Sequence, residues 1–426
     1  MRYEQAIAKL FALASRGIRL GVRRMDAALA YRGAPHTNMS CIQVGGTNGK
    51  GSVASMVASV LTQAGYRTGL YTSPHLHRWV ERIAINGRPM SEREAAQRIS
   101  DVLTDFAKPS APETTFFELT TLIAIEAFRD HGCDIVVLEV GLGGRLDATS
   151  AITPLACAIT RVALDHMNLL GDTLPKIARE KAGILKPAVP VVVGVREPSA
   201  RRVILDRAHR IGAPVCLVDR DYSFEPEPRG RFCARVGDRR FPGLQVRLRG
   251  THQLENGACA VALLHQLESY SHFRALDALA TGLSKTAWPG RMEHLATRPL
   301  IVADAAHNLD GCIALAEHVS RLRHKGPRIL IFGCMRDKDF RPMLRTLGPH
   351  FDQIIYFPPH MPRAATFSML NRIKNGLRAA SAGAALTQAK ALAGSDGLVV
   401  IAGSIFLVAE LRAELLGIRS DPSIRM

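Results

Sequence analysis

The chain has 426 residues, of which 47% are hydrophobic and 22% charged, and its formal net charge is +17. This composition is typical of a globular enzyme with two or three domains, and no apolar run is long enough to span a membrane. Arginines are dispersed and aromatic residues make up only 6%, so we expect no nucleic-acid partner; anionic small substrates, or simply a solvated basic surface, explain the charge at least as well. The eight cysteines form no C-x-x-C pair, which disfavours zinc and favours free thiols in a reducing compartment.

The first predicted element lies in residues 1–25, an amphipathic segment rich in arginine. A mitochondrial transit peptide has a similar composition, but Glu4 lies within this segment and a strand is predicted soon after it. We therefore interpret residues 1–25 as a structural helix with its loop, and we expect the protein to be cytoplasmic.

A phosphate-binding turn follows a predicted strand at 41–44 and opens a helix with apolar positions from Val53 to Ala64. Glycines let backbone N–H groups approach phosphate oxygens, and the helix N-terminus favours negative charge. In such a turn Lys50 reaches the terminal phosphates and Ser52 is a possible Mg²⁺ ligand. An ordinary tight turn is the alternative, but the context favours binding of a nucleoside triphosphate. The turn reads Gly46-Thr47-Asn48-Gly49-Lys50-Gly51-Ser52.

Strands and helices then alternate, which predicts parallel sheets covered on both faces. We expect a P-loop nucleotide-binding domain with a mostly parallel sheet at 1–285, a hinge linker at 286–292, and a smaller Rossmann-like α/β domain at 293–426. Strands are predicted at 68–71, 82–85, 134–140, 155–160, 190–195, 300–303, 328–333, 353–357 and 398–402, with antiparallel strands in 222–249 around a Gly237-Asp238 turn. Helices are predicted after a capping box at Ser91 and Glu94, and at 116–130, 173–183, 198–211 and within 253–283.

Polar side chains stand at the carboxyl ends of three predicted strands, where open parallel sheets bind ligands. Glu139 ends an apolar strand, and a carboxylate there is costly unless it is paired or metal-bound, so it is a candidate Mg²⁺ ligand. The alternative is a strand end that reaches solvent. His166 and Asp304 stand at the ends of the other two strands. The alternative to a ligand-binding role is a surface or core histidine for His166 and the cap of the following helix for Asp304.

The phosphate loop, with its extra glycine between Lys50 and Ser52, resembles that of the Mur ligase family, and within it of the folylpolyglutamate and dihydrofolate synthases. Further stretches in the same order extend the resemblance over most of the chain. They are Thr72-Ser73-Pro74-His75, Glu81-Arg82-Ile83, Glu139 to Thr149, Asp165-His166, Arg179 to Ile184, Trp288-Pro289-Gly290-Arg291, Asp304 to Asn308 and Met335 to Asp339.

The resemblance implies an ATP-dependent ligase that joins L-glutamate to dihydropteroate or to tetrahydrofolate through an acyl phosphate, with ATP and Mg²⁺ as cofactors. It implies that Lys50, Lys181, His166 and His307 are catalytic. It places ATP on the phosphate loop with Asn256, Arg291 and Asp304, and metal on Ser73, Glu139, His166 and a carbamylated Lys181. Substrate-binding residues would be Arg82, Thr115, Phe117, Asp147, His307 and Ser404.

Judged from the residues alone, these positions also have purely structural interpretations. Lys181 would be a solvated helix residue and Ser73 a loop hydroxyl that caps a turn. Thr115, Phe117 and Asp147 would be a loop hydroxyl, a core aromatic and a helix cap. An aromatic slot with a carboxylate also suits a flat pterin that is rich in hydrogen-bond donors.

Other function classes remain open at this point. A small-molecule kinase would need the phosphate loop but not the second α/β domain, and a P-loop protein that binds nucleic acid is a third class. A Mur-type ligase for another carboxylate is also possible, although only 45 residues precede Gly46, too few for the nucleotide-sugar domain of peptidoglycan ligases. We expect a monomer.

Overall fold

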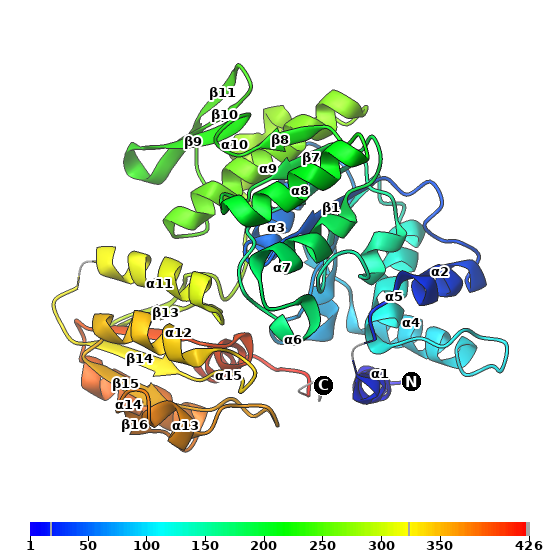
Figure 1. Ribbon diagram of the computed structural model, residues 1–426. Helices are drawn as coiled ribbons and strands as arrows, with labels where there is room; N and C mark the ends of the chain where they lie inside the picture. The colour runs from blue at the N-terminus through cyan, green and yellow to red at the C-terminus, as the bar shows by residue number, and fades with distance from the viewer. Residues whose placement is uncertain (18, 323, 423–426) are drawn as a thin grey trace.

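The structure, a computed structural model, describes residues 1–17, 19–322 and 324–422. Two α/β domains lie side by side, and residues 286–292 connect them without a helix or strand (Figure 1). Among the described residues, no helix is both long and apolar enough to cross a membrane.

An eight-stranded sheet forms the centre of the first domain, in the order β4-β3-β2-β5-β1-β6-β7-β8. At one edge, β3 pairs in antiparallel fashion with both β2 and β4; the remaining pairs are parallel because helices connect their strands. The strands are β1 (Cys41–Gly45), β2 (Thr68–Tyr71), β3 (Ile83–Ile85), β4 (Arg88–Pro89), β5 (Ile135–Glu139), β6 (Ala156–Ile159), β7 (Val191–Val193) and β8 (Val215–Leu217). The helices are α1 (Tyr3–Ala12), α2 (Val22–Tyr31), α3 (Lys50–Gln63), α4 (Glu92–Asp105), α5 (Phe116–Asp130), α6 (Met167–Leu170), α7 (Leu174–Lys181), α8 (Pro198–Arg210), α9 (Thr251–Tyr270) and α10 (Leu279–Lys285).

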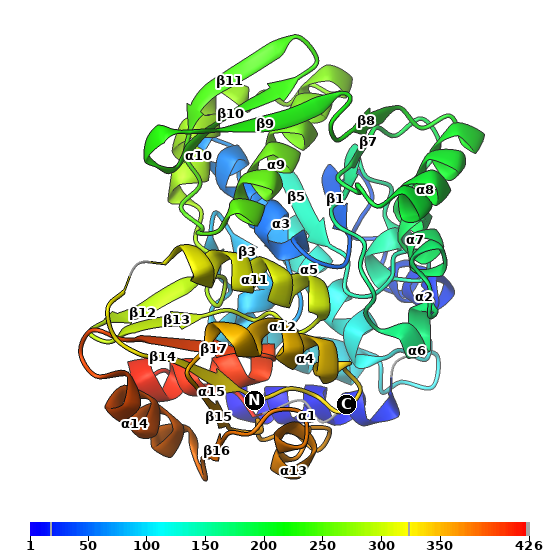
Figure 2. The same cartoon turned by 60° about the vertical axis from the view of Figure 1, so that its left-hand side comes forward.

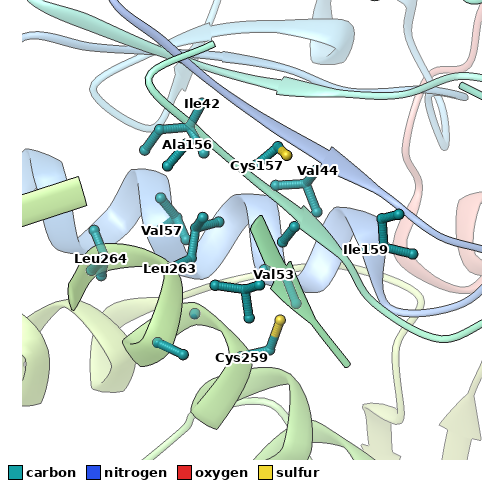
Figure 3. Packing of buried hydrophobic residues seen from close by; sticks show 14 of the residues in the cluster. Ile42, Val44, Val53, Val57, Ala156, Cys157, Ile159, Cys259, Leu263 and Leu264 are labelled. Atoms are coloured by element: carbon teal, nitrogen blue, oxygen red, sulfur yellow. The ribbon is translucent and has the colours of Figure 1, made fainter. Parts of the chain in front are cut away.

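Both faces of this sheet are buried, as the apolar strands require. Ile135 and Val137 of β5 belong to the core shared with α3 and α9, whereas Val136 and Leu138 belong to the core shared with α1, α4 and α5. Figure 3 shows the first core close to the phosphate loop, where side chains of β1 and β6 pack against α3 and α9. The phosphate loop is therefore supported by this buried core.

A three-stranded antiparallel sheet, in the order β11-β10-β9, packs on α9. Its strands are β9 (Tyr222–Glu227), β10 (Arg231–Val236) and β11 (Arg239–Leu244). The predicted Gly237-Asp238 turn is confirmed, with Gly237 at a φ of +54°.

The second domain contains a six-stranded sheet in the order β12-β13-β17-β14-β15-β16 (Figure 2). Helices α11, α12 and α13 cover one face, and α14 and α15 cover the other. The strands are β12 (Glu293–Thr297), β13 (Leu300–Ala303), β14 (Arg328–Phe332), β15 (Gln353–Tyr356), β16 (Leu377–Arg378) and β17 (Leu398–Ala402). The helices are α11 (Leu309–Arg321), α12 (Phe340–Leu347), α13 (Phe367–Asn371), α14 (Ala382–Ala393) and α15 (Ile405–Leu416).

The α/β class and the order of the predicted elements are confirmed, but four strands were not predicted: β4, β8, β12 and β16. All four lie at sheet edges. Three of them, β4, β12 and β16, lack the continuous apolar run that marks a central strand. β8 has an apolar run, but it is only three residues long. Both residues of β4 and of β16 are in fact exposed.

The capping box predicted at Ser91 is only half correct. The Ser91 hydroxyl accepts a hydrogen bond from the N–H of Glu94 at 3.2 Å, as expected. The Glu94 carboxylate, however, accepts from Arg98 and contacts His131 instead of returning to the Ser91 backbone. A guanidinium one helical turn away is a stronger partner for it than an amide N–H.

After α15 the chain returns to the first domain and packs beside α1. The Tyr3 hydroxyl and the Trp79 N–H both donate to Asp421 Oδ2 at 2.7 Å, and the Asp421 N–H donates to the carbonyl of His77. Arg78 forms an ion pair with the same carboxylate at 3.5 Å. This contact ties the end of the second domain to the start of the first.

We predict that Asp421→Ala lowers the midpoint of thermal unfolding. The change leaves the buried Trp79 N–H and the Tyr3 hydroxyl without their acceptor, which costs about 1–3 kcal/mol. Glu4→Ala is the matched control, because it breaks only an exposed pair with Arg419. Equal midpoints for the two variants in calorimetry would contradict the prediction.

Candidate active site

A cleft with a volume of about 570 Å³ lies between the two domains. The carboxyl ends of β5, β6, β13 and β17 face it, so polar residues of both sheets meet there. Every residue that the sequence analysis assigned to the site lines this cleft. They are Gly46 to Ser52, Ser73, Arg82, Thr115, Phe117, Glu139, Asp147, His166, Lys181, Asn256, Arg291, Asp304, His307 and Ser404.

The phosphate loop needs its glycines for space as well as for backbone conformation. Gly46 and Gly49 have φ angles of +139° and +88°, which L side chains rarely adopt. A Cβ on Gly46 would lie 2.0 Å from Thr160 Oγ1, and one on Gly49 would lie 2.5 Å from Asn256 Oδ1. Thr160 Oγ1 in turn donates to the carbonyl of Asn48 at 2.7 Å, which holds the loop against β6.

The extra glycine of the loop, Gly51, has a tertiary explanation. A Cβ on Gly51 would lie 2.7 Å from the ring of Trp288, in the hinge. The position between Lys50 and Ser52 is therefore small because the hinge packs directly on the first turn of α3.

Glu139 is buried, only 5% exposed, so the alternative of a strand end in solvent is wrong. Its Oε2 accepts the N–H of Ser73 at 3.1 Å. Burial raises the pKa of this carboxyl, whereas the charges of Lys50, Arg291 and Arg82 oppose the rise. The carboxylate thus faces several cations and has acceptor capacity left for a ligand.

A magnesium ion fits this position. Mg²⁺ takes one or two protein oxygens and completes its shell with water and phosphate, and the Glu139 carboxylate beside Ser73 offers such oxygens. Among the described residues, no group of three or more His, Cys, Asp or Glu side chains is arranged to hold a metal ion by itself.

Lys181 is buried, 4% exposed, so it is not a solvated helix residue. Its Nζ donates to the carbonyl of Gly46 at 2.8 Å, behind the phosphate loop. Burial, together with the nearby charge of Lys50, lowers the pKa of Lys181 to about 7. A substantial fraction of this amine is therefore unprotonated, and nucleophilic, at neutral pH.

Asp165 joins the two domains, a role that sequence reasoning missed. Its carboxylate, in the loop after β6, faces His307 Nε2 at 3.2 Å, accepts from the Asn308 amide at 3.2 Å and pairs with Lys338. Burial would raise the pKa of this carboxyl, but the hydrogen bond from His307 and the charge of Lys338 hold it well below its ordinary value. The only signal in the sequence was that Asp165 and Lys338 belong to two of the family-like stretches.

The phosphate loop also contacts the second domain directly. The side-chain amides of Asn48 and Asn308 exchange two hydrogen bonds of 3.0 Å, and Asn48 donates to Asp310 at 2.7 Å. Asn308 also caps α11, accepting from Gly311, so the cap interpretation of Asp304 is wrong. Movement of the second domain would therefore act on the phosphate loop.

His166 is in the left-handed region, with a φ of +50°, and its side chain is 43% exposed beside Asp165. Burial lowers its pKa to about 4, although the charge of Asp165 opposes the shift. The imidazole is thus neutral at pH 7, the form in which it can ligate a metal.

On the predicted substrate side of the cleft, the three residues assigned to the pterin have structural contacts of their own. Thr115 is the N-cap of α5, in a capping box with Glu118, and the ring of Phe117 packs over Gly141. The Asp147 carboxylate caps the 3₁₀ turn Ala148–Ala151, accepting from Thr149, and also accepts from the N–H of Leu142 at 2.9 Å. The cap interpretation of Asp147 is therefore correct, whereas Thr115, expected as a loop hydroxyl, is also a helix cap; both residues line the cleft.

On the predicted nucleotide side, Asn256 donates to Gln253 at 3.0 Å in the first turns of α9. Asp304 accepts the N–H groups of Met292 and Ala306 at 2.9 and 2.8 Å, which fixes the hinge beside Arg291 to the end of β13. Burial raises the pKa of the Asp304 carboxyl, against the charge of Arg291. Ser404 caps α15, accepting from Phe406.

Comparison with known proteins identifies the class. The Mur ligase middle domain matches residues 44–264, and the Mur ligase glutamate ligase domain matches residues 290–405. The chain belongs to the Mur ligase family of ATP-dependent ligases.

Within that family the similarity is to enzymes that add glutamate to folates. The dihydrofolate synthase/folylpolyglutamate synthase of Bacillus subtilis is 33% identical, covering 94% of this chain and 96% of that protein. Escherichia coli FolC in complex with DHPP and ADP superimposes with a TM-score of 0.88 at 29% identity, over 97% of this chain and 98% of that one. The Yersinia pestis bifunctional enzyme complexed with AMPPNP and Mn ion gives a TM-score of 0.88 at 32% identity, over 98% of each chain. The protein is thus an ATP-dependent ligase of the dihydrofolate synthase/folylpolyglutamate synthase type.

The low pKa of Lys181 predicts a pH dependence of stability. Because the amine has a pKa of about 7 when folded and an ordinary one, 10.5, when unfolded, the unfolded chain binds more protons between these values. Buried Lys181 therefore destabilises the folded protein most below pH 7, and this destabilisation disappears as the pH rises toward 10.5. We predict that Lys181→Met unfolds at a higher temperature than wild type at pH 6, and that this gap narrows by pH 9.5. Thermal unfolding in CO₂-free buffer measures it; a gap that is constant with pH would contradict the prediction.

Proposed function

We propose that the enzyme uses both dihydropteroate and tetrahydrofolate, joining each to L-glutamate. The observation that carries the proposal is that one cleft holds the phosphate loop, the buried Glu139 and the buried Arg82 together. A ligase of this kind needs the γ-phosphate of ATP and a substrate carboxylate side by side. Arg82 is the cation on the folate side and Lys50 the one on the phosphate side.

In the proposed reaction the substrate carboxylate attacks the γ-phosphate, giving an acyl phosphate and ADP, and the amine of glutamate then displaces phosphate. Lys50 and Arg291 stabilise charge on the transferring phosphoryl group, the main demand of such a step. Glu139 and Ser73 would hold a magnesium ion, with a second position near His166, and the metal would supply further charge neutralisation. Asp147, Thr115 and Phe117 bind the pterin ring.

The second domain contributes His307 and Ser404 to the same cleft, and we propose that they bind the incoming glutamate. The contacts of Asp165 with His307 and Lys338 support a closed arrangement of the domains. Closure matters because an acyl phosphate hydrolyses if water reaches it.

We also propose that Lys181 is carbamylated. A neutral amine adds CO₂ with loss of a proton and becomes an anionic carbamate. The lowered pKa of Lys181 supports this step, since a lysine at its ordinary pKa is mostly protonated. The carbamate would add an oxygen ligand near the metals.

The remaining proposals concern the domain boundaries, the oligomeric state and the cellular location. Residues 1–285 are the ATP-binding domain, 286–292 the hinge and 293–426 the glutamate ligase domain. We propose a cytoplasmic monomer that binds no nucleic acid.

The proposed function predicts ADP release that depends on glutamate. With MgATP and dihydropteroate, adding L-glutamate should stimulate ADP release about tenfold or more and yield the amide, identified by mass spectrometry; tetrahydrofolate should behave likewise. A kinase would release ADP without glutamate and leave a phosphorylated substrate. ADP release that is equal with and without glutamate would contradict the proposal.

Lys50→Ala should lower the turnover about 100-fold or more, because it removes a preorganised charge from the phosphoryl group. The fold should be intact, since a loop lysine contributes little packing. Lys390→Ala, on the exposed side of α14, is the matched control and should be fully active. A Lys50→Ala enzyme with normal ADP release would remove the phosphate loop from the mechanism.

A further inference from the structure

Arg82 is a buried cation that forms no ion pair within the described residues, although the charges of Glu139 and Glu81 act on it from a greater distance. Its side chain ends the 3₁₀ turn Trp79–Arg82 and is 3% exposed, yet it lines the cleft. Burial lowers the pKa of this guanidinium. A buried cation of this kind is costly unless a partner compensates it, so the site is built to receive an anion.

The guanidinium is held by neutral and aromatic groups instead. Its Nε donates to Nδ1 of His75 at 2.8 Å, and its carbon lies 5.5 Å from the centre of the Phe116 ring. The His75 ring is stacked on Phe11 with 6.0 Å between centres and 7° between planes. Three separate elements therefore fix one arginine: α1, the loop after β2 and α5.

The hydrogen bond also fixes the protonation of His75. Arginine can only donate, so Nδ1 of His75 must be the unprotonated nitrogen and the ring proton must lie on Nε2. Burial, together with the charge of Arg82, lowers the pKa of His75 well below its ordinary value, which agrees with a neutral ring.

The loop that presents His75 is itself anchored. The N–H groups of Leu76, His77 and Arg78 all donate to the carboxylate of Glu81, at distances between 2.7 and 3.3 Å. His75 does not line the cleft, so it can act on a substrate only through Arg82.

Because Nε is committed to His75, the two terminal amino groups of Arg82 are the donors left for a ligand. Their spacing matches the two oxygens of a carboxylate, which they can bind end-on and bidentately. We propose that His75 is a positioning residue that fixes the Arg82 guanidinium so that its terminal amino groups bind the carboxylate that the ligase activates. This inference rests on the proposed function.

Three variants test the inference. In His75→Asn the amide oxygen takes the place of Nδ1 and keeps the acceptor; in His75→Gln the oxygen lies one methylene farther out; His75→Phe keeps the stacking on Phe11 without an acceptor. We expect His75→Gln and His75→Phe to raise KM for dihydropteroate about tenfold, with KM for ATP unchanged, because a small misplacement of a carboxylate clamp is expensive. His75→Asn should stay within about threefold of wild type.

His324→Phe is the matched control. Arg328 Nε also donates to a histidine, at Nε2 of His324, but this pair lies in the second domain, outside the cleft. It should change neither KM. A purely structural role of His75 would instead lower the unfolding temperature and alter both KM values together.

Crystal structures of the unliganded variants separate this inference from the proposed function. Arg82 should keep its position in His75→Asn and leave it in His75→Gln and His75→Phe. An unmoved Arg82 in the last two, or equal KM values in all three variants, would overturn the positioning role. If wild type shows no glutamate-dependent ADP release, the proposed function fails, while the position of Arg82 still decides what His75 does.

Discussion

The ion pair between Asp165 and Lys338 joins two separately folded α/β domains into one site. Each domain has its own sheet and its own cores, so each could bury its apolar residues without the other. The cleft exists because Asp165 reaches His307, Asn308 and Lys338 across the boundary. A buried carboxylate requires such partners, and all three come from the second domain. Asn48 adds a second connection, from the phosphate loop to Asn308.

Charge in the cleft is arranged for anionic ligands. Lys50 and Arg82 approach the pocket as cations, while Glu139 is the buried carboxylate that faces them. Lys181 adds little positive charge, because burial and the nearby Lys50 lower its pKa to about 7 and a large fraction of the amine is neutral. A triphosphate and a folate carboxylate would supply the missing negative charge, which explains why a site of this kind binds its substrates in the cleft and not on the surface.

The predicted elements that proved correct share a strong local signal. Central strands such as 134–140, and the glycine-rich turn, can be predicted because apolar runs and the need for glycine at particular backbone conformations are local properties of the sequence. The four missed strands lie at sheet edges, where the apolar pattern is weak or, in β8, very short. Glu94 shows a second limit of prediction from sequence. Its carboxylate contacts Arg98 of its own helix and His131 at the end of a neighbouring helix, and the second contact depends on how the two helices pack.

The sequence by itself determined the fold class, the order of the central elements and a few cleft residues at strand ends, such as Glu139 and Asp304, because parallel sheets bring those ends together. The other predicted cleft residues, such as Thr115 and Asn256, rested on the family resemblance. Only the tertiary structure decided which of these side chains are buried, which are paired and how they are oriented. Asp165 and Lys338 are 173 residues apart, and nothing local predicts their contact. Gly51 must be small because Trp288 packs on it, and Arg82 is oriented by His75, Phe11 and Phe116 from three elements. Burial and pairing depend on which surfaces meet, and that is set by the packing of whole elements.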